Sequence, residues 1–582
     1  MNFNIFRRVG RLAAIGAILF SSASCVYINE ELGENLMPTD QKWDVYTPAP
    51  AVLSEIRMER TDSLSAYNSS RFTFGSINDP QFGTSIKSTS FTLVPIGDSL
   101  SFGENVRIRQ FHFTAALDTV STLYDNQSRI IQNVYVSELK APLDTHALYI
   151  GTFMNEEKRA KYLNLENRIT AGTPVYDGGD SLSFDFSLEY AAKVIEKLDK
   201  EKLDSIGEYT AMLPGIFITT DTPAAQGGRI NMFRLGLQTN DGYVTANYAE
   251  LKVTADFGER KDVDTTFLFF FGPGRIMKTS DNQAPDQFAF NTSNHETYTD
   301  ALAAEGEDGP REKLHVEGGA GAKPVITAKE IKSIVTDMLT ENGIENFNEV
   351  VINKATVILP YQMPADYKDM ELYPTVLSPT VKLHSENGGY VTYAGLTDSS
   401  IESEDQGDIN RSTCLYSPDI SHHVQEILKL DENAEDFEKK ISSYDIWMLI
   451  MHDEIQISNN TSSNNDLYNS LAYSSYYNNM MYGGYGGYGG YGGYGYGGYG
   501  YGYGGYGYGY DSYGYGYNNY YNYMMMASMA GSYSTGEKTA RSIDKDRFYH
   551  AVLNGPGYGS DDDIERKPRL KITFSAPKSA EK

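Results

Sequence analysis

The tetrapeptide Gly-Asp-Ser-Leu contains a serine that could act as the nucleophile of a hydrolase. It occurs at 97–100 and again at 179–182, and it names a class of serine esterases. Asp419 and His422 follow in the order Asp-x-x-His, which that class uses to activate its serine. Such a nucleophile sits once, near the mature N-terminus, at a turn between a strand and a helix. Both copies here are turn-like and continue into strand-like Ser-Phe sequences, so we predict no enzymatic function, with serine esterase as a remote alternative.

The other parts of an esterase site are equally poor matches. Gly236 and Asn240-Asp241 could pose as the oxyanion block, but the spacing between them is too long. Asn240-Asp241-Gly242 is instead typical of a hairpin turn. His422 lies in a repeated segment whose other copy carries Leu188 close to the equivalent position, so a structural role is sufficient for it.

Histidine and carboxylate groups suggest metal binding at three places, and none has a suitable spacing. His422 and His423 are adjacent, so they diverge on a helix or strand and cannot both bind one ion. The segment 452–454, His-Asp-Glu, is expected in a solvated loop at the end of a strand. Asp561 to Asp563 with Glu565 could attract calcium, but the segment lacks the regular spacing of ligands and glycine found in a calcium-binding loop. We therefore interpret it as an acidic turn. We therefore predict no metal and no cofactor.

Cys25 is the residue for which the sequence most clearly predicts a chemical modification. Three arginines precede a short apolar run at 12–20, and small residues at 21–24 lead to the cysteine. This order is typical of a secretory signal, and the cysteine makes it a lipoprotein signal. The apolar run is too short to span a bilayer, which takes about 20 residues. We predict a signal peptide at 1–24, a lipid such as palmitate on Cys25 and a tether at 25–45, although Ser22 stands where such signals usually carry an aliphatic residue.

The net charge and composition limit the classes of molecule that this protein can bind. The 582 residues include 49 Lys and Arg against 77 Asp and Glu, a net charge of −28. Such a field repels nucleic acid and anionic headgroups, so membrane association must come from the lipid. The acidic pair Glu30-Glu31 just behind Cys25 resembles the signal that sends some Gram-negative lipoproteins to the cell surface. Cys414, the second cysteine, is expected to be a small buried hydrophobe.

Two distant parts of the chain read as copies of one unit. In each, a short strand leads into an amphipathic helix, a buried strand follows, and a closing strand ends the unit. The helices and the buried strands share one offset between the copies, whereas the closing strands lie further apart in the sequence. The paired segments are 185–199 with 419–431, 216–221 with 448–453, and 251–254 with 570–573.

A tract of Tyr and Gly at 458–542 accounts for the larger offset of the closing strands. Glycine at this density loses much entropy on folding and buries no side chain, which predicts a disordered insertion in one surface loop. Two interpretations remain open. The tract is either an adhesive arm whose rings stack on a ligand or a repeat that expanded in a tolerant loop.

The rest of the pattern predicts a mainly β, β-rich α+β fold of two tandem, repeat-related β-sandwich halves with a few single helices. One helix is signposted by a capping box of Thr327 and Glu330. We expect the first half at 46–260, a linker at 261–290 and the second half at 291–576. The strands are expected at 108–117, 131–139, 350–359 and 390–393.

A set of short motifs runs in order along the mature chain: Leu32-Gly33, 74–80 with Phe82-Gly83, 134–139, 215–218, 315–321, 352–355, 373–375, Ile420 with Val424-Gln425, Asn554-Gly555 and 568–573. Their order resembles the domain of unknown function 4270 family of outer-membrane lipoproteins. The Tyr/Gly tract departs from the family pattern. The resemblance implies a lipid-anchored protein of the outer membrane, and it carries over no catalytic residue because the family has no assigned activity.

Two classes of function follow from these observations. The first is a non-catalytic binding module at the cell surface that contacts a glycan or a protein through its loops. The alternative is a structural or accessory subunit of an outer-membrane assembly or transport complex, held by its lipid beside an integral protein. Exposed aromatic rings on a rigid loop would favour the first, because sugars need flat, preorganised platforms. A large apolar patch on a sheet face would favour the second.

Overall fold

The computed structural model describes most of the chain after residue 42. It covers residues 43–61, 63–119, 130–143, 148–240, 243–278, 285–295, 310–384, 391–396, 398, 405–457, 537–560 and 562–577. The signal peptide, Cys25, the tether up to residue 42 and residues 458–536 of the Tyr/Gly tract lie outside these ranges, and so does Asp561. The prediction of a disordered tract falls on the residues outside.

The first half is a sandwich of two antiparallel sheets. One sheet has the order β13-β8-β18-β19-β7, with β7 Leu93–Pro95, β8 Glu104–Ala116, β13 Ser181–Asp185, β18 Tyr248–Phe257 and β19 Arg260–Phe271. The other has the order β11-β10-β14-β6-β20-β4, with β4 Tyr67–Asn68, β6 Gly83–Phe91, β10 Tyr135–Leu139, β11 Leu163–Arg168, β14 Ile216–Thr219 and β20 Ala289–His295. It continues through β5 Arg71–Asp79 into β15 Gly227–Arg234. The aromatic core between them includes Phe72 and Phe113, with ring centroids 6.4 Å apart.

The second half repeats this arrangement. One sheet has the order β1-β30-β23-β26, with β1 Trp43–Tyr46, β2 Ala51–Val52 beside it, β23 Val351–Pro360, β26 Leu415–Tyr416 and β30 Arg569–Pro577. The other has the order β25-β24-β27-β22-β3, with β3 Ile56–Arg60, β22 Ala322–Ile326, β24 Val376–His384, β25 Val391–Gly395 and β27 Ile446–Ile457, and β28 Glu537–Ile543 paired to β27. A separate pair joins β21 Lys313–Glu317 to β29 His550–Asn554.

Helices and short strands complete the two halves. The first half carries α2 Glu156–Tyr162, α3 Leu188–Leu198 and α4 Ile206–Met212, and the second carries α6 Ala328–Glu341, α7 Ser421–Leu428 and α8 Phe437–Ser442. Two further pairs are β9 Gln132–Asn133 with β12 Val175–Tyr176, and β16 Gln238–Asn240 with β17 Tyr243–Ala246. In the last pair Asn240 lies opposite Tyr243, and residues 241 and 242 of the predicted hairpin turn lie outside the described ranges.

The pairings confirm the internal repeat. Strand β8 lies between β13 and β18 in the first half, just as β23 lies between β26 and β30 in the second. Strand β14 follows α3 and α4 and pairs with β10, as β27 follows α7 and α8 and pairs with β24. The pairing of β5 with β15 in the first half is matched by the pairing of β21 with β29 in the second half. The fold is mainly β, with helices as single elements.

Four predicted boundaries are wrong. The expected linker at 261–290 contains most of β19, whose Phe269 and Phe271 are buried after a tight turn at Gly258 (φ +61°). Strand β20, which reaches into the expected second half, pairs with β6 of the first. Strands β1 to β3, from the expected tether and first half, pair instead with β30 and β22. The last residues of the expected Tyr/Gly insertion form β28, opposite β27.

Helix α6 begins where the capping box predicts. Thr327 is its N-cap, and the Thr327 hydroxyl accepts a hydrogen bond from the Glu330 N–H at 3.3 Å. The Glu330 carboxylate, however, accepts bonds from the backbone N–H and hydroxyl of Ser54 and from the N–H of Glu55. Glu330 therefore also holds the segment at Ser54 and Glu55 against the second half. The sequence did not indicate this contact, because the two partners are 276 and 275 positions away from Glu330.

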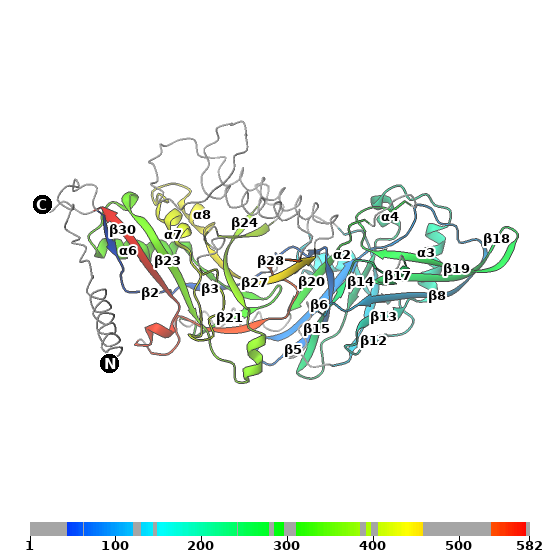
Figure 1. The fold of residues 1–582 in the computed structure, drawn as a ribbon, viewed down its shortest axis with the longest axis horizontal. Coiled ribbons are helices and arrows are strands. Elements are labelled where there is room, and N and C mark those ends of the chain that lie inside the picture. The colour runs from blue at the N-terminus through cyan, green and yellow to red at the C-terminus, as the bar shows by residue number, and fades with distance from the viewer. Residues whose placement is uncertain are drawn as a thin grey trace, which may run out of the picture.

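The two halves are joined end to end in an elongated molecule (Figure 1). The sheet containing β23 and β30 lies at one end of the long axis, and the sheet containing β8, β18 and β19 lies at the other. Strands β5, β6, β15, β20, β21, β27 and β28 occupy the middle. Two apolar clusters cross this junction: one unites Phe290 with Val325 and Trp447, and the other unites Ile77 with Leu372.

Candidate functional site at the junction of the two halves

Two equivalent hairpins meet where the halves join. The turn between β5 and β6 carries the motif Asp79-Pro80-Gln81-Phe82-Gly83, and the turn between β21 and β22 carries the Gly-rich segment 317–321. Gly319 has a φ of +60°, and a Cβ there would overlap the Lys87 ammonium. Sequence motifs that looked unrelated therefore face each other across the junction.

Phe82 forms the apolar part of the contact. Its ring is 2% exposed, stacks on His550 with centroids 4.7 Å apart, and meets His315 edge-on at 5.4 Å. Asp79 holds the turn by accepting the N–H groups of Gln81 and Phe82, both at 2.8 Å, and its other oxygen lies 3.1 Å from His550 Nδ1. Burial, together with the cationic Lys313 beside it, lowers the pKa of His315 to about 4, so His315 is neutral at physiological pH.

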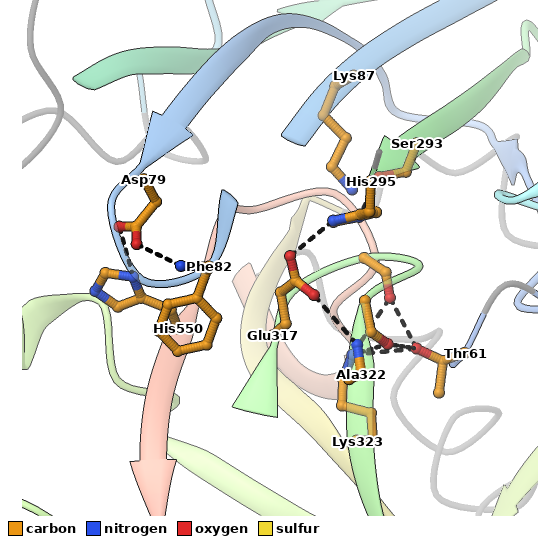
Figure 2. A network of polar contacts seen from close by, with 12 residues as sticks. Thr61, Asp79, Phe82, Lys87, Ser293, His295, Glu317, Ala322, Lys323 and His550 are labelled. Carbon is orange, nitrogen blue, oxygen red and sulfur yellow. Dashed lines mark hydrogen bonds and ion pairs between the residues drawn. The ribbon is translucent and has the colours of Figure 1, made fainter. Parts of the chain in front are cut away.

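Glu317 is the central anion of the junction (Figure 2). It is 2% exposed, and its Oε1 lies 2.7 Å from His295 Nδ1 while its Oε2 accepts the Ala322 N–H at 3.3 Å. Burial alone would raise the Glu317 pKa, but His295 and the positive charge of Lys323 outweigh it and hold this pKa below its usual value. His295 Nε2 contacts the Ser293 hydroxyl at 2.8 Å, so both ring nitrogens are engaged.

Two buried lysines face this carboxylate from opposite halves. Lys323 is 1% exposed and donates to the Thr61 hydroxyl at 3.1 Å and the Gly319 carbonyl at 3.4 Å. Burial lowers the Lys323 pKa to about 7, with attraction to Glu317 opposing the shift. Lys87 is 2% exposed, donates to the Lys545 carbonyl at 3.0 Å, and also has a pKa lowered by burial.

The segment 544–547 of the second half forms hydrogen bonds with residues of the first half. Lys545 donates to the carbonyls of Ser65 and Tyr67, while Asp546 accepts from Asn68 at 2.6 Å and from Asn291 at 3.1 Å. Asp544 accepts the N–H of Asp546 at 3.1 Å and lies 2.7 Å from the Arg547 guanidinium. Burial would raise the Asp544 pKa, but Arg547 and His452 more than compensate and lower it.

The geometry of the junction suits a structural role. Its carboxylates and ammonium groups are almost fully buried, and the contacts of Glu317 with His295, of Lys87 with the Lys545 carbonyl and of Asp546 with Asn68 and Asn291 run between the two halves. A buried charge that is paired and hydrogen-bonded resists rearrangement, because separating the partners would leave an uncompensated charge. The network therefore fixes one relative orientation of the halves.

Lys323→Met should remove part of the pH dependence of stability. The native pKa of Lys323 is about 7 and the unfolded value is about 10.4, so between these pH values only the unfolded state keeps the proton. The free energy of unfolding of the native chain should then rise with pH across this window, by up to about 1.4 kcal/mol per pH unit more than that of the variant. Denaturant unfolding at several pH values measures it. Lys329→Met, at an exposed lysine, is the control, and parallel profiles for Lys323→Met and the native chain would contradict the prediction.

The two Gly-Asp-Ser-Leu copies lie apart from this junction network. Ser99 is exposed and forms an isolated bridge with Lys202, and Ser181 is exposed as the first residue of β13. Neither serine stands at a helix start. His422 lies in α7 of the other half, where its backbone N–H donates to Asp398 at 2.7 Å. Asp419 accepts the N–H and hydroxyl of Ser421, the first residue of that helix.

The candidate metal ligands have separate structural surroundings. His423 is buried in α7 and its Nε2 lies 2.8 Å from the Tyr444 carbonyl oxygen. The expectation of a solvated loop at 452–454 is wrong for His452, which is buried in β27 beside Asp544. Asp563 accepts the Ser560 N–H and hydroxyl, both at 3.0 Å, as an acidic turn would. In the part of the chain that the structure describes, no three His, Cys, Asp or Glu side chains are placed to hold a metal ion.

Cys414 differs from its expected state. It is half-buried rather than buried, and it sits in a turn with a φ of +55°. Its side chain packs at the rim of the second core, and the thiol is free. Residues 411–414 form a turn that is closed by backbone hydrogen bonds between Asn410 and Leu415, the first residue of β26.

An ordered loop beside the junction carries an exposed aromatic ring that sequence reasoning missed. Tyr367 is 78% exposed at the start of the 3₁₀ helix Tyr367–Glu371. The loop is fixed at both ends to β29: Gln362 N–H donates to the Val552 carbonyl at 2.8 Å, and His550 N–H donates to the Leu372 carbonyl at 3.0 Å. Nothing in the local sequence distinguishes this tyrosine, because its exposure follows from anchors on a strand near the end of the chain.

Comparisons with known proteins return no match among protein-family models, curated proteins or solved structures. The resemblance to the domain of unknown function 4270 family therefore stays a prediction from the motifs. Among the described residues, no helix has the length and apolar character needed to cross a bilayer.

Proposed function

We propose that this protein is a lipid-anchored outer-membrane protein of the domain of unknown function 4270 type, which displays a non-catalytic binding module for a glycan or a protein ligand outside the cell. The anchor is Cys25, and the acidic residues behind it support export to the surface. The strong negative charge suits a solvated outer surface and disfavours nucleic acid as a partner.

The observation that carries the binding function is the Tyr367 loop. An aromatic ring that is 78% exposed offers an apolar face and a hydroxyl to a ligand. Its backbone is held before binding by Asp366, which accepts the Lys368 N–H at 2.9 Å, and by the two anchors to β29. Such preorganisation lowers the entropy lost on binding, which is what a flat sugar-stacking platform requires.

The buried junction supports a non-catalytic role. Glu317, Asp544 and Asp546 are the most strongly buried carboxylates near the centre of the molecule, and each is engaged in bonds that hold the structure together. A general acid or base needs a proton-donating or proton-accepting atom within reach of a substrate. These groups are instead enclosed between two sheets, so the loops around them are the better candidates for ligand contact.

Tyr367→Ala should weaken binding on an array of immobilised oligosaccharides by about two- to tenfold, because one aromatic stacking contact contributes about 0.5–1.5 kcal/mol. The purified full chain is applied at several concentrations, and bound protein is measured on each sugar. Ile564→Ala is the matched control, since Ile564 is an exposed apolar side chain on a different loop, at 47% exposure.

Equal binding by both variants and the native chain would contradict a role for this loop. A stoichiometric integral membrane protein that co-purifies in mild detergent with the native chain and with Tyr367→Ala alike, without sugar binding, would instead support the accessory-subunit alternative.

A further inference from the structure

The sheet at the tip of the second half exposes an apolar row on its outer face. Trp43 is 47% exposed, Val45 is 66% exposed and Val351 is 48% exposed. Trp43 and Val45 alternate to the same side of β1, opposite to Tyr46, whose ring stacks on Phe574 in the core at 5.2 Å. Register brings the row together, because Val45 lies opposite Ser575 of β30 and Ser575 lies opposite Val351 of β23.

The strand residues around this row carry no carboxylate on the same face. Thr573 and Ser575 of β30 occupy its centre, and Lys571 and Lys354 lie further along. The Lys354 ammonium lies 3.9 Å from the buried carboxylate of Asp419, which bridges to Thr356 at the edge of β23, outside these three strands. Asp44, the acidic residue of β1, alternates to the other side with Tyr46. A face without acidic strand residues is unusual in a chain that has 77 acidic residues against 49 basic ones.

The corresponding sheet of the first half shows the contrast within one molecule. Strand β19 pairs with β18 in the first half, and β1 is the equivalent neighbour of β30 in the second half. Its exposed residues are charged or polar, with Asp262, Asp264 and Thr266 outward, and β18 adds Glu250 and Lys252, which pair with each other. Two sheets of one repeated design therefore differ in their outer faces, and they lie at opposite ends of the long axis (Figure 1).

The apolar face lies next to the start of the anchor. The short segment between Cys25 and Trp43 reaches at most about 60 Å when it is fully extended. A lipid on Cys25 would therefore keep this end of the molecule near the bilayer, whereas the charged sheet lies at the far end. Tryptophan favours the interface between headgroups and acyl chains, and lysine can place its ammonium among lipid phosphates while its stem stays apolar.

We propose that the outer face of the β1-β30-β23 sheet rests on the lipid bilayer and orients the molecule away from it. The inference depends on the lipid anchor of the proposed function. The lipid supplies the affinity, and the row of Trp43, Val45 and Val351 supplies the orientation, because three apolar side chains alone give weak binding.

Tryptophan fluorescence of the full lipidated chain tests this orientation. The chain contains two tryptophans, and Trp447 is 4% exposed in the junction, so the difference between the native chain and Trp43→Phe reports on Trp43. The protein is reconstituted in vesicles of phosphatidylcholine and phosphatidylglycerol, with and without bromine on the acyl chains. The Trp43 emission should shift to shorter wavelength in vesicles and should be largely lost in the brominated ones.

The double variant Val45→Asp, Val351→Asp should keep the vesicle association that the lipid provides and lose the bromine quenching. The matched control adds the same two charges to the charged sheet, as Ser181→Asp with Thr266→Asp, and should be quenched like the native chain. Both control positions are exposed on the outer side of that sheet.

Trp43 emission that stays unquenched while the lipidated protein is bound to vesicles would overturn the inference and leave the anchor intact. A shift that occurs in native membranes but not in vesicles would assign the face to a protein partner and would also overturn it. A mass spectrum without lipid on Cys25 would overturn the anchor itself, and with it the inference, so the two failures are distinguishable.

Discussion

Phe82→Ala should lower the free energy of unfolding by about 3–5 kcal/mol, the range typical of a buried phenylalanine that leaves a cavity. The ring is 2% exposed and is packed between His550 and His315 of the other half, so the cavity would open at the junction. We also expect the single unfolding transition to separate into two, because the contacts that couple the halves are weakened. Denaturant unfolding in a Trp43→Phe background, followed by the fluorescence of Trp447 in a cluster shared by both halves, measures both effects.

Phe102→Ala is the matched control for this variant. Phe102 is fully buried, but it lies within the first half against Phe267, with centroids 4.5 Å apart. It should cost a similar free energy while the transition stays single. A loss below about 0.5 kcal/mol for Phe82→Ala, the range of ordinary surface substitutions, would show that the junction does not depend on this ring.

Glu317→Ala should destabilise the protein by about 3–5 kcal/mol, because removing one partner of a buried charge network leaves the other charges uncompensated. His295, the Ala322 N–H and Lys323 would lose the anion that they face. Thermal and denaturant unfolding measure the loss. Glu438→Ala, which breaks the exposed pair with Lys329, should cause no measurable change.

Glu317→Gln separates the charge of this residue from its shape. The native pKa of Glu317 lies below its unfolded value of about 4.3, so its contribution to stability is present above that pH and is lost as the pH falls. The variant should therefore lose less stability on acidification than the native chain. Identical acid unfolding profiles would show that the Glu317 charge does not contribute.

The sequence predicted much of the secondary structure because local patterns carry it. The capping box at Thr327 predicted the start of α6, and the strands expected at 108–117 and 350–359 are β8 and β23. The repeat was visible because both copies bury the same faces at the same spacing. The prediction of a linker at 261–290 failed because β19 is buried on one side only and reads as polar over its first residues.

The candidate site was much less predictable. Phe82, Glu317 and Gly319 were noticed as motif residues, but their shared position depends on two hairpins that lie in different halves of the chain. Lys87, Lys323 and the segment 544–547 gave no signal at all, since isolated charged residues in an acidic chain look like solvent-facing ones. Burial decides their role, and burial is a property of the assembled halves.

The sequence by itself determined the mainly β class, the internal repeat and the positions of the helices α3, α6 and α7, because periodicity and turn residues act over a few neighbours. Only the tertiary structure decided that β1 to β3 complete the second half, that a charged network lies buried between the halves, and that Trp43 and Val351 share one exposed face. These features depend on strand register and on contacts between distant segments. Their free energy comes from burial and pairing in the folded chain, and no local pattern reports it.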